Sequence, residues 1–175
     1  MDQHELYALT TRTIQAYDTD RAVPHSDVSA IANMLFDCAG KDSRHGYVRK
    51  SETIFWPTSP KVVLGKNGIV ELPIKAKFQK SLYRDGELLR VVHAKDKRDV
   101  LIVICKSDSD CNGGAMEHIC ATITISNFPV GLLLSQRRAF FFFQGKNDDE
   151  GIQPGPEFSD ISKHVPEIAD IIRDL

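Results

Sequence analysis

The stretch "CKSDSDCNGGAMEHIC", residues 105–120, concentrates the residue types that could carry chemistry. It holds three of the chain's four cysteines and one of its six histidines. Cys105, Cys111, His118 and Cys120 are four ligands of the kinds that bind zinc in a tetrahedron. Their spacing, C-x5-C-x6-H-x-C, differs from the short ligand pairs of small zinc motifs. We therefore expect a strand–loop–strand connection in which these cysteines are incidental, with no bound metal and no disulfide.

Two kinds of catalysis remain as alternatives for this stretch. Cys111 or Cys120 could act as a nucleophile with His118 as its base, although the sequence assigns no third group to orient that base. A metal-dependent nuclease or another hydrolase could use residues around 99–120, where Asp99 and Lys106 stand at the two ends of an apolar segment. Such nucleases need a carboxylate close before the lysine, and none stands at that spacing.

Two amphipathic helices are predicted at the start of the chain. Apolar residues recur at helical spacing over residues 3–17 and again from Ser26 to Gly40, and Pro24 lies between the two segments. They would form a helical hairpin. Leu6, Leu9, Leu35 and Phe36 exceed what two short helices can cover, so we expect self-association through these helices.

Residues 9–35, "LTTRTIQAYDTDRAVPHSDVSAIANML", resemble the N-terminal region of the Ros/MucR bacterial transcriptional regulators. The shared pattern is Leu9-Thr10, Ala16-Tyr17, Val23-Pro24 and Asp27-Val28, followed by an apolar Ile31. The resemblance implies a helical association region. It carries over no DNA-reading residue and no zinc ligand, because the zinc finger that follows in that family has no counterpart here.

Beyond a polar, basic segment at residues 41–51, the apolar period changes from 3.6 to 2, which predicts strands. Hairpins are expected around Asn67-Gly68 and Asp85-Gly86, a central strand over residues 100–105, and further strands over 118–126 and 131–144. Residues 145–158 are expected to be a loop, and residues 165–175 a closing helix. The prediction is an α+β fold with a largely antiparallel, curved sheet of about six to eight strands. Its expected parts are a helical hairpin (1–40), a basic linker (41–51) and an α+β domain (52–175).

The charge of the chain is uneven although its formal net charge is only −2. Residues 1–40 carry a net −4, residues 41–98 carry +8 and residues 99–175 carry −6. The basic middle either balances acidic neighbours within the fold or forms an anion-binding face. For such a face, the cations expected on one side of the hairpins and the linker are Arg49, Lys50, Lys75, Lys77, Arg84 and Arg90.

The composition, 42% hydrophobic and 26% charged, is that of an ordinary globular chain. No apolar run reaches the roughly 18 residues of a membrane span, and the polar N-terminus "MDQHELYALT" is no signal peptide. We expect a cytoplasmic protein with reduced thiols, no cofactor and no membrane contact. The favoured function is a non-enzymatic regulatory or interaction protein that contacts nucleic acid or a protein partner. The alternatives are a hydrolase or nuclease, and an inhibitor- or immunity-type binding partner.

Overall fold

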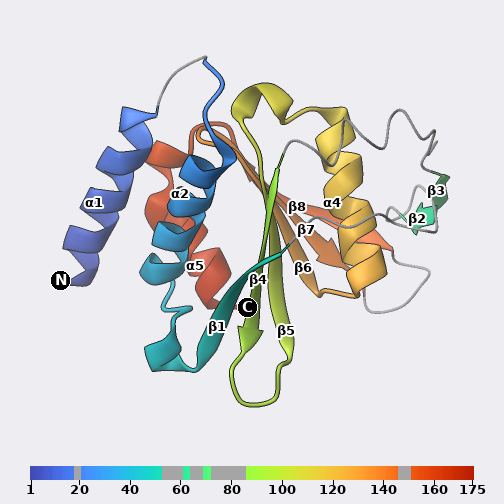
Figure 1. The fold of residues 1–175 in the computed structure, drawn as a ribbon, viewed down its shortest axis with the longest axis horizontal. Helices are drawn as coiled ribbons and strands as arrows, with labels where there is room; N and C mark the ends of the chain where they lie inside the picture. Colours follow the sequence, from blue (N-terminus) through green and yellow to red (C-terminus); the bar gives the residue numbers. More distant parts are fainter. Residues whose placement is uncertain (18–20, 53–60, 64–68, 72–85, 146–150) are drawn as a thin grey trace.

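The computed structural model describes residues 1–17, 21–52, 61–63, 69–71, 86–145 and 151–175. A twisted sheet separates two helical layers (Figure 1). Helices α1 (Gln3–Ala16), α2 (His25–Cys38) and α5 (Val165–Arg173) lie on one face, and α4 (Gly113–Ser126) lies on the other. The α+β class expected from the sequence is confirmed.

The main sheet has six strands in the order β1-β4-β5-β6-β7-β8. Every neighbouring pair is antiparallel except β5 and β6, which run parallel and are joined by α4. The strand bounds are β1 Tyr47–Glu52, β4 Glu87–His93, β5 Asp99–Cys105, β6 Val130–Leu134, β7 Ala139–Gln144 and β8 Ile152–Phe158. The sheet is thus largely antiparallel, as expected, with one βαβ unit in its centre.

The predicted central strand and the first predicted hairpin are both present. Strand β5 lies between β4 and β6, and its residues 100–105 are all buried. Strands β2 (Lys61–Val63) and β3 (Ile69–Glu71) pair antiparallel as a separate small sheet. The expected turn residues Asn67-Gly68 and Asp85 lie outside the described residues.

The expectation of a strand over residues 118–126 is wrong, because they form the second half of α4. The side chain of Asn112 caps this helix by accepting a hydrogen bond from Ala115 N at 3.3 Å. Ala115, Ile119 and Ile123 recur at four-residue spacing and are fully buried against the sheet. This packing outweighs the strand preference of the isoleucines and threonines in "HICATITIS".

Both edges of the sheet depart from the prediction. The segment 41–51, expected to be a linker, instead contains a 3-10 helix, η1 (Ser43–His45), and most of β1, which pairs with β4. Residues 152–158, expected to be a loop, form β8, which pairs with β7. Pro154 and Pro156 lie in this strand, and proline is tolerated in an edge strand because an outward-facing position needs no N–H donor.

The apolar stripe of α2 is covered by the chain itself. Leu35 and Phe36 are completely buried in a core that includes residues of β5 and α5. The reason given for self-association, an apolar surface too large for two helices to cover, was therefore wrong for α2. Among the described residues, Leu9 and Met1 are the only large hydrophobic side chains classed as exposed.

Candidate functional site

The residues of the cysteine stretch do not converge on one point. Cys105 faces the core beneath α1, α2 and α5, whereas Cys111 and Cys120 belong to the core on the α4 side of the sheet. His118 and Cys120 are two positions apart on α4, which places them about 200° apart around the helix. Over the described part of the chain, no group of three or more metal-ligating side chains is found.

Burial also shifts the pKa values of these groups in the directions that disfavour nucleophilic chemistry. Desolvation raises the pKa of the Cys111 and Cys120 thiols to about 12, and it raises the pKa of the fully buried Cys105 thiol well above its usual value. Burial, with the charge of Lys106, lowers the pKa of His118 to about 3. A reactive cysteine needs a lowered thiol pKa, so the arrangement gives neither a thiolate nor a base working near neutral pH.

Asp99 and Lys106, the pair considered for a nuclease, stand at opposite ends of β5. Seven residues of extended chain separate them by roughly 23 Å. Asp99 accepts an ion-pair hydrogen bond from Arg90 at 3.3 Å, and Lys106 is 2% exposed. The two side chains therefore do not form a common metal or phosphate site.

A polar network holds the loop that follows β5. Arg138 Nε donates to Asp108 Oδ1 at 2.8 Å, and the other guanidinium contacts are to the carbonyls of Asp108 and Cys111. The buried Ser135 hydroxyl donates to the same carboxylate at 2.7 Å. Because these groups satisfy one another, the network explains how the β5–α4 loop is fixed, and it leaves little polar capacity for a ligand.

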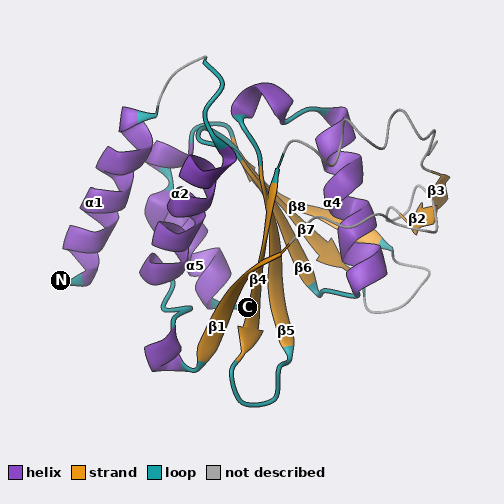
Figure 2. Ribbon diagram, in the orientation of Figure 1, coloured by secondary structure: helices purple, strands orange, loops and turns teal. Residues whose placement is uncertain are grey.

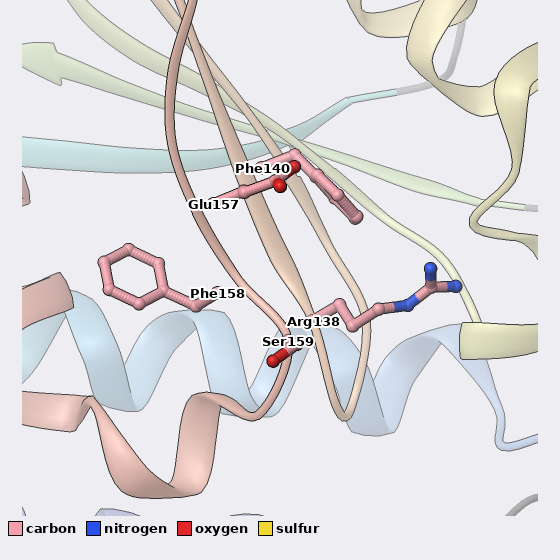
Figure 3. Close-up of a pocket in the computed structure, with 5 residues that line it drawn as sticks. All are labelled: Arg138, Phe140, Glu157, Phe158 and Ser159. Atoms are coloured by element: carbon pink, nitrogen blue, oxygen red, sulfur yellow. The ribbon is translucent and has the colours of Figure 1, made fainter.

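A hollow of about 290 Å³ lies beside this network (Figure 3). Its lining is Arg138, Phe140, Glu157, Phe158 and Ser159. Figure 3 shows the rings of Phe140 and Phe158 pointing in opposite directions, and Arg138 extending away from Phe158. The volume is just below the 300–1,000 Å³ typical of small-molecule sites, and its one cation is engaged in the loop network.

The cations predicted to form one basic face do not all share it. Arg49 points to the helical layer, where it pairs with Asp37 at 2.6 Å and stacks over Phe36. Lys50 is exposed on the opposite face, directly across from Arg90. Arg90 is half-buried over the ring of Phe128. Lys75, Lys77 and Arg84 lie outside the described residues.

A different set of cations is brought together at one end of the sheet. The tip of the β4–β5 hairpin and η1 both lie at the lower end of the molecule in Figure 2. Ala94 N donates to Gly46 O at 2.9 Å, and the rings of Tyr47 and His93 are 4.9 Å apart, so the two segments are in contact. We call this set the basic corner: Arg44, His45, His93, Lys95, Lys97 and Arg98.

The basic corner is exposed and has an excess of positive charge. Apart from His93, which is half-buried, all of its residues are exposed. Asp42 and Asp96 are the carboxylates close to it. Asp42 accepts from His45 Nδ1 at 2.7 Å, and Asp96 accepts from the backbone N–H of Arg98 at 3.0 Å. Both acids are therefore occupied in holding η1 and the hairpin turn.

A polar hollow of about 520 Å³ adjoins the basic corner, and Arg44 and His45 line it together with Lys41, Tyr47 and Arg173. The buried Lys41 ammonium uses its three donors on Tyr47 Oη and the carbonyls of Arg173 and Leu175. Arg173 donates to Tyr7 Oη and Cys38 O. These two cations stabilise the fold. Arg44 and His45 are exposed and both contact Asp42, Arg44 at 3.5 Å and His45 at 2.7 Å.

The sequence signal for the basic corner was the segment "HAKDKR", in which three cations surround a hairpin turn. The pairing of β1 with β4, which brings η1 beside this turn, was not predicted.

In comparisons with known proteins, no family model matches the chain, and no significant match is found among curated proteins or solved structures. No described helix has the length and apolar content needed to cross a bilayer.

Proposed function

We propose that this protein is a non-enzymatic interaction protein that binds nucleic acid through the basic corner. The observation that carries the proposal is the gathering of exposed cations from two chain segments at one end of the sheet. Arg44 comes from η1, and Lys95, Lys97 and Arg98 come from the β4–β5 turn. Phosphate groups are the anions that such a cluster of guanidinium and ammonium groups binds best.

The shape of the corner favours a duplex. The β4–β5 hairpin extends past β6, which pairs only with residues 102–105 of β5. Strand β1 pairs with β4 along this part of the hairpin, so the projecting end has three strands and only the β4–β5 turn lies beyond them. This turn would enter the major groove of B-DNA, which is about 12 Å wide. Its lysines and Arg44 beside it would contact phosphates on the groove walls, so binding would depend little on sequence.

The residues around 99–120 support this proposal over the hydrolase and nuclease alternatives. Their thiols and His118 are buried, and Asp99 is paired with Arg90. Asp108 holds the loop after β5 through Arg138 and Ser135. These side chains are explained by the stability of the loop and the core, whereas Arg44, Lys95, Lys97 and Arg98 are exposed at the surface.

The test is fluorescence anisotropy of a short labelled duplex at about 50 mM salt. The variant Lys95→Gln/Lys97→Gln/Arg98→Gln removes charge from the turn, and the control Lys50→Gln/Lys163→Gln removes exposed charge from β1 and η4 (Ile161–Lys163). At this salt, release of counterions from one phosphate contact is worth roughly tenfold in affinity. We expect the turn variant to bind at least tenfold more weakly and the control to lose less than threefold. A wild-type protein that does not bind, or equal losses in both variants, contradicts the proposal.

A further inference from the structure

We propose that nucleic-acid binding at the basic corner is coupled to the protonation of His93, so that acidification strengthens it. This inference rests on the proposed function, and it concerns the regulation of the same site. It starts from one contact: Arg98 Nη2 lies 2.8 Å from His93 Nε2.

The contact fixes the protonation state of the imidazole. A guanidinium group has only donors and does not lose its proton in proteins. His93 Nε2 must therefore be the acceptor, which requires a neutral ring with its proton on Nδ1. In this state, one Nη2–H of Arg98 points at the imidazole and is unavailable to a phosphate.

The charged and titratable groups around His93 come from three elements. The β4–β5 turn contributes Lys95, Asp96, Lys97 and Arg98. Strand β1 contributes Tyr47, whose ring centroid lies 4.9 Å from that of His93. The segment before η1 contributes Lys41, whose ammonium lies 4.3 Å from the centroid of the Tyr47 ring. The hydrogen bond from Arg98 N, together with the charge of Arg98, lowers the pKa of Asp96. A protonated His93 thus has one nearby carboxylate and several cations that favour an incoming anion.

Protonation reverses the role of Nε2 from acceptor to donor. The Arg98 hydrogen bond is then lost, because both groups are donors, and the guanidinium is released toward solvent. The corner gains the charge of His93 and a freed Arg98 side chain. Imidazole is the side chain that takes up a proton between about pH 5 and 8.

His45 differs in a way that makes His93 the determining residue. His45 Nδ1 faces the Asp42 carboxylate at 2.7 Å and can donate to it whether or not the ring is charged. Protonation of His45 therefore breaks no hydrogen bond and frees no arginine. The structure assigns the larger effect to the His93–Arg98 pair.

The first experiment compares duplex binding at pH 8.0 and pH 5.5 at about 50 mM salt. Wild type should bind about tenfold more tightly at pH 5.5, the value of one additional phosphate contact. His93→Gln should change less than threefold, since glutamine can accept from Arg98 at both pH values. His164→Gln, at the start of α5, is the matched control and should behave like wild type. An unchanged pH response in His93→Gln overturns the proposal.

A second measurement needs no nucleic acid. Long-range ¹H–¹⁵N NMR spectra distinguish the two neutral forms of a histidine ring. At pH 8.0, His93 should carry its proton on Nδ1, and protonation should shift the Arg98 guanidinium signals with the same midpoint. A proton on Nε2 at pH 8.0 refutes the coupling even if binding occurs. If His93 carries its proton on Nδ1 at pH 8.0 but the protein binds no duplex, the proposed function is refuted. The coupling then has no binding site on which to act.

Discussion

Replacement of Gly131 by alanine tests how closely α4 is packed on the sheet. Gly131 lies in β6, and a Cβ atom built on it would lie 2.3 Å from Ile123 Cδ1 and 2.6 Å from Ile123 Cγ1. It would also lie 3.1 Å from Ile119 Cδ1. Both isoleucines are fully buried, so the side chains that would have to move have little free space.

The expected cost follows from two opposing effects. Forcing an extra methyl group into a packed core costs about 1–3 kcal/mol, whereas replacing a strand glycine by alanine contributes about 0.5–1 kcal/mol of stability. The net loss should be about 1–2 kcal/mol in the free energy of unfolding. In a chain of this size, that corresponds to a fall of roughly 2–8 °C in Tm.

Thermal and urea unfolding, followed by circular dichroism, measure this loss. Gly113→Ala is the matched control, because Gly113 begins α4 and a Cβ there would meet nothing within 4 Å. That variant should be as stable as wild type or more stable by up to about 1 kcal/mol. Gly131→Ala with unchanged or increased stability would refute the packing of α4 on β6.

Three further predictions concern Asp108, the cysteine thiols and Lys41. Burial favours the neutral form of Asp108, but hydrogen bonds from Arg138 and Ser135 lower its pKa below the usual 3.8. The ionised carboxylate therefore stabilises the folded protein fully above pH 3.8, and this contribution is lost as the pH falls through the lowered pKa. Asp108→Asn should cost about 1.5–3 kcal/mol at pH 7, and urea unfolding should show the difference shrinking as the pH falls through the lowered pKa of Asp108. The native thiols, including Cys111, should resist a disulfide reagent at pH 8 and react only on unfolding, as absorbance would show; rapid labelling of folded protein would contradict their burial. Lys41→Met should lower the free energy of unfolding by about 2 kcal/mol, because the carbonyls of Arg173 and Leu175 lose their donor, and an unchanged urea midpoint would contradict that role.

The parts of the fold that the sequence predicted are those with a distinct apolar period. The α1–α2 hairpin and α5 each show a helical apolar period, whereas β5 is a continuous apolar run, and each of them is present. Helix α4 was missed because its sequence combines a helical spacing of buried residues with residues that prefer strands. Only the packing of Ile119 and Ile123 against Gly131 decides between them, and that contact is not visible in a local pattern.

The residues of the candidate site could be predicted less well than the helices and strands. A strand pattern tells which side chains alternate, but not which face each strand presents to the helices. Arg49 and Lys50 are adjacent in sequence and therefore point to opposite faces of β1, where Arg49 pairs with Asp37. The corner instead depends on the register of β1 with β4, which places Tyr47 opposite His93. Register is set by pairing across the sheet, so the sequence alone could not bring Arg44 beside the hairpin turn.

The most direct test of the proposed function is to locate the duplex on the protein by NMR. Backbone amide signals would be followed while a short duplex is added at about 50 mM salt. The proposal predicts that the largest shifts fall on residues 43–47 and 93–98, and that they disappear at about 500 mM salt, as phosphate contacts require. Shifts that centre on α4 or β8, or that persist at high salt, would contradict it.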